Sequence, residues 1–153
     1  MRPILNCSNI ETSSQICRVE EGKEIFFRHS EFEMVCNVIG VDSCIFKNTL
    51  GVRSCDYLFL FDRAKQQYNF LNNKSSLAYY VELKGIDLVS ACEQLHNSID
   101  MTMNQIESFD INALVVSTRA FIPKYDNNEF YRAVKRLIRK NIQFEITPHI
   151  VNL

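Results

Sequence analysis

The chain has 153 residues, a length typical of one folded domain, and hydrophobic residues make up 46% of it. Eleven Phe and six Tyr exclude a disordered protein. The 17 basic and 18 acidic residues give a net charge of -1, so the charge of the whole chain does not indicate nucleic-acid binding. No apolar run approaches the roughly 20 residues that a membrane span needs, and we expect no membrane partner.

The cysteines indicate a reduced, cytoplasmic protein. No secretory signal segment is visible, and thiols such as Cys36 and Cys92 stand within apolar stretches, where they behave as small hydrophobic residues. The chain contains no Cys-x-x-Cys, and its three histidines are not at metal-ligand spacing from any cysteine. We therefore expect buried thiols without disulfides or zinc. The six cysteines are Cys7, Cys17, Cys36, Cys44, Cys55 and Cys92.

The first part of the chain is predicted to be mostly β-structure. Residues 1 to about 23 are polar and show no clear pattern, although a short helix after Thr12 is one interpretation. Runs of apolar and β-branched residues predict strands at 25–27 and 32–41. Asn-Thr-Leu-Gly at 48–51 predicts a turn.

Two strong strands and a helix follow. Residues 55–61 and 77–84 are apolar and aromatic, and Gly85 stops the second run. Asp87 is a good N-cap for an amphipathic helix that extends toward Ile106. The apolar face of this helix comprises Leu88, Ala91, Cys92, Leu95 and Ile99.

The last third alternates strand and helix. Residues 112–117 form an apolar run, Pro123 breaks the chain, and 128–140 predict a second, basic helix. A short strand is expected near 144–146. No repeat or linker divides the chain, so we predict a single α/β domain over residues 1–153. The apolar face of the second helix comprises Phe130, Val134, Leu137 and Ile138.

Charged residues at the ends of the two strong strands are the main functional signal. Acidic residues are normally depleted in strands, yet Asp56 opens one strand and Glu82 lies near the end of the other. Glu82 and Lys84 project on one face because they are two residues apart, and Asp56 can approach them if the strands are neighbours. Two carboxylates bind Mg²⁺ readily, and a lysine can serve an attacking water, so this set suits phosphodiester hydrolysis.

Asp56, followed by Glu82-Leu83-Lys84 at the end of the next strong strand and then by a capped helix, resembles the PD-(D/E)XK nuclease superfamily. The resemblance implies that Asp56, Glu82 and the carbonyl of Leu83 bind Mg²⁺. It implies that Lys84 serves the attacking water. Gln94 matches in type and place the glutamine that many members carry on the following helix.

The resemblance covers about residues 53–118. It implies a restriction-endonuclease-like core with a mixed central β-sheet flanked by helices. The implied activity is that of a Mg²⁺-dependent nuclease, with Mn²⁺ as an alternative ion and DNA favoured over RNA as the substrate. Small domains of this type occur in restriction, repair and defence, often as homodimers or with a partner subunit.

Three features depart from the family pattern. Cys55 stands where the name-giving proline would be, a substitution that the superfamily tolerates. The connection from Asp56 to Glu82 spans 26 positions and needs a long or decorated hairpin. The acidic residue that many members carry on an N-terminal helix is not identified, and the candidates are Glu20, Glu21 and Glu33. This missing acid leaves an alternative open, in which an inactive nuclease-like fold acts as a nucleic-acid-binding or protein-interaction module.

Two charged sets also have simpler interpretations. Glu82 and Lys84 could form an ion pair on a solvated sheet face. The second helix carries a basic stripe with Glu129 as its only acidic residue, which suits either a phosphate backbone or a solvated helix face. The stripe, which we name the basic stripe, comprises Arg132, Lys135, Arg136, Arg139 and Lys140.

Overall fold

A computed structural model describes residues 1–68, 70–71, 75–83, 87–117, 128–147 and 149–153. The largest sheet contains β1 (Asn9–Ser13), β4 (Met34–Gly40), β5 (Tyr57–Phe61), β6 (Ser76–Glu82), β7 (Phe109–Val116) and β8 (Gln143–Thr147). These strands lie in the order β1-β4-β5-β6-β7-β8. The first four are antiparallel neighbours, whereas β6, β7 and β8 are parallel. The sheet is therefore mixed, as predicted.

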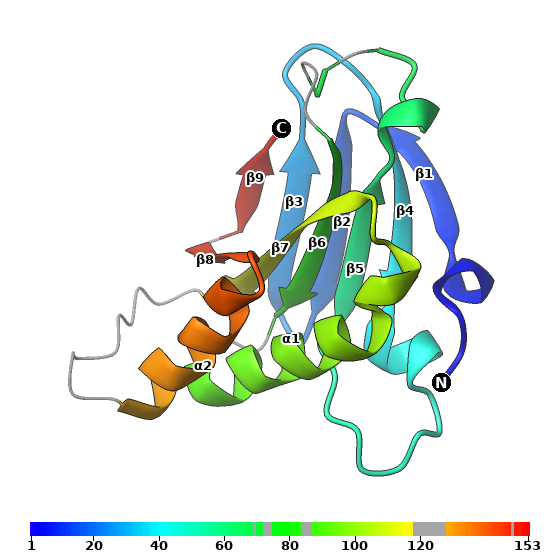
Figure 1. Ribbon diagram of the computed structural model, residues 1–153. Helices are drawn as coiled ribbons and strands as arrows, with labels where there is room; N and C mark the ends of the chain where they lie inside the picture. The colour runs from blue at the N-terminus through cyan, green and yellow to red at the C-terminus, as the bar shows by residue number, and fades with distance from the viewer. Residues whose placement is uncertain (69, 72–74, 84–86, 118–127, 148) are drawn as a thin grey trace.

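Two helices and a second sheet cover the two faces of this large sheet. Helix α1 (Leu88–Thr102) joins β6 to β7, and α2 (Asn128–Arg139) stands between β7 and β8 in the chain. Figure 1 shows both helices across one face. The smaller sheet has the order β2-β3-β9 and packs on the other face. Its strands are β2 (Gln15–Glu20), β3 (Lys23–Arg28) and β9 (Ile150–Asn152).

The alternation along β5 explains these layers. Leu58 and Leu60 belong to the apolar cluster that includes the helices, whereas Phe59 and Phe61 belong to the cluster under the small sheet. Successive strand side chains point to opposite faces, so an uninterrupted apolar strand must be covered on both sides. Phe27 of β3 supplies part of this cover, with its ring centroid 4.6 Å from that of Phe59.

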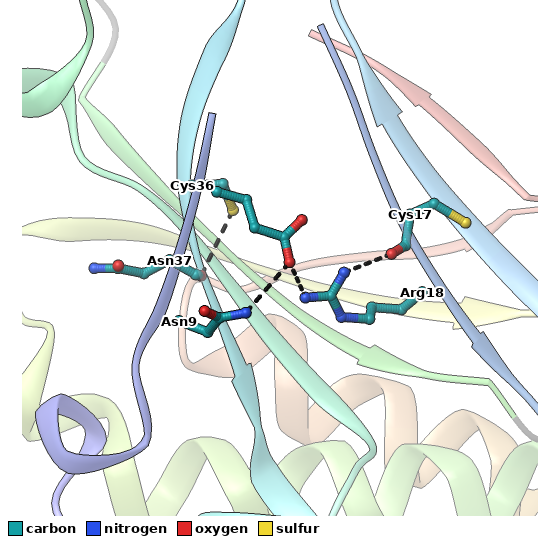
Figure 2. Close-up of polar contacts among 6 residues, drawn as sticks. Asn9, Cys17, Arg18, Cys36 and Asn37 are labelled. Atoms are coloured by element: carbon teal, nitrogen blue, oxygen red, sulfur yellow. Dashed lines mark hydrogen bonds and ion pairs between the residues drawn. The ribbon is translucent and has the colours of Figure 1, made fainter. Parts of the chain in front are cut away.

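Polar contacts also join the two sheets. The chain passes from β1 to β2 through Ser14 alone. Glu11 of β1 forms an ion pair with Arg18 of β2, and its carboxylate accepts a hydrogen bond from the Asn9 amide. Figure 2 labels Asn9 and Arg18, whose dashed contacts meet at this carboxylate. Two residues further along β2, the Tyr57 hydroxyl donates to Glu20 at 3.1 Å. These contacts join the second half of β2 to the large sheet.

The predicted helices are confirmed. Asp87 caps α1, because its carboxylate accepts the Ser90 N–H at 3.1 Å. Leu137 of α2 is fully buried, but Ile138 is 59% exposed, so the expected apolar face was too wide. None of the helices in the described ranges is long and apolar enough to cross a membrane. Pro123, expected to break the chain, and Gly85 lie outside the described residues.

The N-terminal segment differs from the helix considered after Thr12. It forms the strands β1 and β2 instead, which pair antiparallel with β4 and β3 respectively. Its polar residues gave little signal because β1 is an edge strand that is largely exposed. Short 3₁₀ turns also occur, namely η1 (Ile4–Cys7), η3 (Arg63–Lys65) and η4 (Met103–Gln105), together with the π-helical turn η2 (Val41–Ile45).

The expectation that every thiol is reduced was wrong. Cys7 of η1 and Cys44 of η2 form a disulfide, with their Cα atoms 5.8 Å apart. The pairing joins positions 37 residues apart, a relation that thiol spacing alone does not reveal. The remaining described thiols are free, and Cys36, Cys55 and Cys92 are buried as expected. The prediction of a cytoplasmic location loses part of its support, because disulfides are rare in that compartment.

Candidate active site

Asp56 lies beside the end of β6, as the spacing of the charged residues predicted. It stands directly before β5, which begins at Tyr57 and not at residue 55. Tyr57 pairs with Val81 at the end of the antiparallel register, and the Asp56 N–H donates to the Val81 carbonyl at 3.1 Å. The Leu83 N–H donates to Asp56 Oδ2 at 2.9 Å. One carboxylate therefore bridges the beginning of β5 and the end of β6.

Glu82 is fully buried. By alternation it shares a face of β6 with Ala78 and Tyr80, which pack in the cluster that includes α1. This burial contradicts the interpretation of Glu82 as part of a solvated sheet face. A buried carboxylate is costly unless it is paired or binds a cation, so a structural or chemical reason for its position is required.

The structure describes one of the other two members of the predicted centre, Leu83. Leu83 is fully buried and donates its N–H to Asp56, whereas the role of its carbonyl as a metal ligand stays a prediction. Lys84 lies outside the described residues, so its predicted role also stays a prediction.

Three polar side chains of α1, those of Gln94, Asn97 and Ser98, hold the segment that leads into Asp56. The Gln94 amide donates to the Ser54 carbonyl at 2.9 Å, and Ser98 Oγ accepts the Cys55 N–H at 2.9 Å. The Asn97 amide reaches the Arg53 carbonyl at 3.4 Å. Gln94 thus lies near the site as predicted, and its hydrogen bond to the Ser54 carbonyl positions the backbone.

A pocket of about 470 Å³ opens beside this segment. Leu83 and Gln94 line it together with Arg53, whose guanidinium donates to Ser90 and lies 3.9 Å from the Glu93 carboxylate. The lining carries both signs of charge. It comprises Glu21, Lys23, Arg53, Leu83, Asp87, Ser90 and Gln94.

Glu21 is the candidate acid that reaches this pocket. It lies in the β2–β3 turn and lines the pocket, whereas Glu20 accepts the Tyr57 hydroxyl. Glu33 directly precedes β4. The opposite end of β4, at Gly40, pairs with Tyr57, so Glu33 lies at the end of the sheet remote from Asp56. None of these three described candidates lies on a helix, and the identity of a further acidic ligand stays a prediction. Sequence reasoning overlooked Lys23, although the Glu-Gly dipeptide beside it is a turn signal.

The carboxylates affect the neighbouring thiol. Burial raises the pKa of Cys55, and the charges of Glu82 and Asp56 raise this pKa further, against a lowering by the Ser98 hydrogen bond. Cys55 is therefore a protonated, inert core thiol beside the carboxylates and not a nucleophile.

The basic stripe of α2 is exposed at Arg132, Lys135, Arg136 and Arg139. Lys140 differs, because its ammonium forms an ion pair with Asp100 of α1. Asp100 also lies 3.6 Å from His96, and burial together with the charges of Lys140 and Arg136 lowers the pKa of that histidine. One end of the stripe thus joins the two helices, and the rest faces solvent.

The oxygen donors present suit a hard cation. Asp56 stands directly before β5 and Glu82 ends the neighbouring β6, and Mg²⁺ is commonly bound through one or two carboxylates with waters completing the shell. No larger group, of three or more His, Cys, Asp or Glu arranged around a common metal position, occurs among the described residues. The fit to Mg²⁺ therefore rests on two carboxylates, those of Asp56 and Glu82.

Comparison with known proteins adds no family to this description. The chain matches no protein-family model, no curated protein and no solved structure.

Proposed function

We propose that the protein is a Mg²⁺-dependent nuclease of the PD-(D/E)XK type, with a restriction-endonuclease-like core, that hydrolyses phosphodiester bonds in DNA. The observation that carries the proposal is the hydrogen bond from the Leu83 N–H to Asp56 Oδ2. It brings a carboxylate from one strand against the Glu82-Leu83 segment of the next. The order of β4, β5, β6, α1 and β7 supports the same core.

Each residue has a defined task in this proposal. Asp56, Glu82 and the Leu83 carbonyl hold Mg²⁺, and Glu21 contributes a further carboxylate from the β2–β3 turn. Bound Mg²⁺ supplies a Lewis acid that polarises the phosphodiester and acidifies an attached water. Lys84 orients the attacking water and accepts its proton. Gln94 keeps the segment before Asp56 in place.

The test separates the chemical role of Asp56 from its structural one. Asp56→Asn keeps an oxygen that can accept the Leu83 N–H but removes the negative charge. We expect Asp56→Asn and Lys84→Ala each to lower Mg²⁺-dependent cleavage of plasmid and single-stranded DNA about 100-fold or more. We expect Mg²⁺ to raise the melting temperature of the wild type and of Lys84→Ala, but not of Asp56→Asn.

Asp62→Asn is the matched control. Asp62 also accepts a backbone N–H, that of Ala64, but it caps η3 at the other end of β5. This variant should cleave as the wild type does. Equal cleavage by wild type, Asp56→Asn and Lys84→Ala would contradict the site assignment.

A second candidate function is a non-catalytic binding module. The observation that favours it is again the Asp56–Leu83 contact, because a carboxylate that joins two strand ends has a structural use without chemistry. This function predicts that the wild type retains DNA in Mg²⁺ without cleaving it and that Asp56→Asn changes stability alone.

A further inference from the structure

A stack of aromatic rings stands at the end of the large sheet remote from Asp56. The imidazole of His29 stacks on Phe32 with ring centroids 5.2 Å apart and planes at 22°. Phe32 in turn stacks on Tyr68, at 4.8 Å and 16°. The three rings form a nearly parallel ladder. Tyr68, the outermost ring, is 48% exposed.

The inner end of this ladder is fixed by backbone contacts. His29 Nδ1 accepts the N–H groups of both Glu31 and Phe32 at 3.0 Å. The imidazole therefore cannot turn without losing two hydrogen bonds. Phe70, which is buried, packs against the same imidazole at 5.3 Å. The exposed ring of Tyr68, stacked on these fixed inner rings, is therefore held in one orientation.

The segment that carries Tyr68 is also anchored. The Gln66 amide donates to the carbonyls of Val35 and Asp62 at 2.7 and 2.9 Å, and its oxygen accepts the Val35 N–H at 2.8 Å. This side chain thereby pairs with the backbone of β4 as a neighbouring strand would. Its hydrogen-bonding groups are used for structure and not for a ligand.

A pocket of about 250 Å³ lies against Tyr68. Buried Leu71 lines it, and exposed Gln67 and Arg63 provide an amide and a guanidinium. A flat ring, an amide and a cation at one small pocket match the base face, the base edge and the phosphate of a nucleotide. Rings stack on aromatic faces, amides pair with base edges, and guanidinium groups bind phosphate.

We propose that this pocket binds a nucleotide unit, with its base stacked on Tyr68, its base edge at Gln67 and its phosphate at Arg63. The unit belongs either to single-stranded nucleic acid or to a free nucleotide. The site is separate from the candidate active site, because Asp56 and Tyr68 lie beyond opposite ends of β5. Binding here does not require cleavage, so it can be tested with the metal removed.

The experiment measures the fluorescence anisotropy of labelled oligothymidylate in EDTA, with wild type, Tyr68→Ala and Tyr68→Phe. We expect Tyr68→Ala to weaken binding about tenfold and Tyr68→Phe to bind as the wild type does. An abasic oligonucleotide of equal length separates stacking from phosphate attraction, and it should be insensitive to Tyr68→Ala. Ile10→Ala, at an exposed apolar residue of β1, is the control and should not change affinity.

Quenching of tyrosine fluorescence by thymidine and adenosine monophosphates identifies the source of the unit. Tyr68-dependent quenching without oligonucleotide binding assigns the pocket to free nucleotides, and the converse assigns it to single strands. Equal affinity of wild type and Tyr68→Ala for both ligand classes would overturn the proposal. Binding of the abasic oligonucleotide as tightly as oligothymidylate would also overturn the proposal. Unchanged melting temperatures for the Tyr68 variants exclude misfolding as the cause of a loss.

Discussion

Glu21 has an unfavourable backbone conformation beside the pocket. Its φ is 47°, and that of Gly22 is 75°, so both central residues of the β2–β3 turn are left-handed. This is the backbone of a type I′ hairpin turn, in which Asn or Gly is usually found at the first position. A glutamate there is strained, which suggests that its side chain serves a purpose other than the turn.

We expect Glu21→Asn to stabilise the protein by on the order of 0.5–1 kcal/mol, because asparagine adopts positive φ at lower cost. We expect the same change to reduce the Mg²⁺-dependent rise in melting temperature. Urea titrations with and without Mg²⁺ measure both effects. Glu21→Gln is the matched variant, since it removes the charge but keeps the strain. A full Mg²⁺ response in both variants would contradict a ligand role for Glu21.

The candidate site was partly predictable from single residues. Asp56 and Glu82 were conspicuous because strands rarely carry acids at such positions, and the pairing of β5 with β6 brings the beginning of one strand to the end of the other. Glu21 was not assignable in the same way. It reaches the pocket from a different sheet, and only the packing of the two sheets brings residue 21 near residue 83.

At the scale of elements, η1 and η2 are held together by the Cys7–Cys44 disulfide. The bridge closes a loop over a sequence separation of 37 residues, which restricts the unfolded chain and should stabilise the fold by about 3–4 kcal/mol. We expect the Cys7→Ser/Cys44→Ser double variant to lose that amount, measured by urea unfolding without reductant. The wild type in reductant should unfold as the double variant does.

Cys17→Ser provides the control for this prediction, because Cys17 is a free thiol in β2. It should keep the full difference between oxidised and reduced midpoints. Identical midpoints for oxidised and reduced wild type would show that the bridge does not stabilise the fold. The turn η2 also adjoins the candidate site, since the Val41 N–H donates to the Asp56 carbonyl at 2.9 Å.

Strong apolar periodicity predicted β5, β6, α1 and α2 close to their observed bounds. The strands that were missed are β1, β2 and β9. The strand β1 is polar and largely exposed, β2 stands in the same polar N-terminal segment, and β9 has only three residues, too few for a period to show. Each depends on a partner strand, β4 or β3, and not on a pattern of its own.

For the whole molecule, the near-zero net charge conceals an uneven distribution. The basic stripe of α2 is exposed except at Lys140, which pairs with Asp100. We expect Arg139→Ala to reduce the salt dependence of duplex DNA binding, with the slope of log K against log salt falling by about 0.9. Fluorescence anisotropy between about 50 and 200 mM KCl measures this slope.

Lys140→Ala is the neighbouring comparison. Its ammonium is already engaged with Asp100, so we expect a smaller change in slope and a modest loss of stability. A larger loss of DNA affinity in Lys140→Ala than in Arg139→Ala would contradict a backbone-binding role for the exposed part of the stripe.

The parallel pairing of β3 with β9 has a consequence for the order of folding. Phe26 pairs with Ile150, so the small sheet joins residues that lie far apart in the chain. The β2–β3 hairpin forms between neighbouring segments, but its third strand must be brought in from near residue 150. Pairings over such separations close slowly, which favours completion of this layer late in folding.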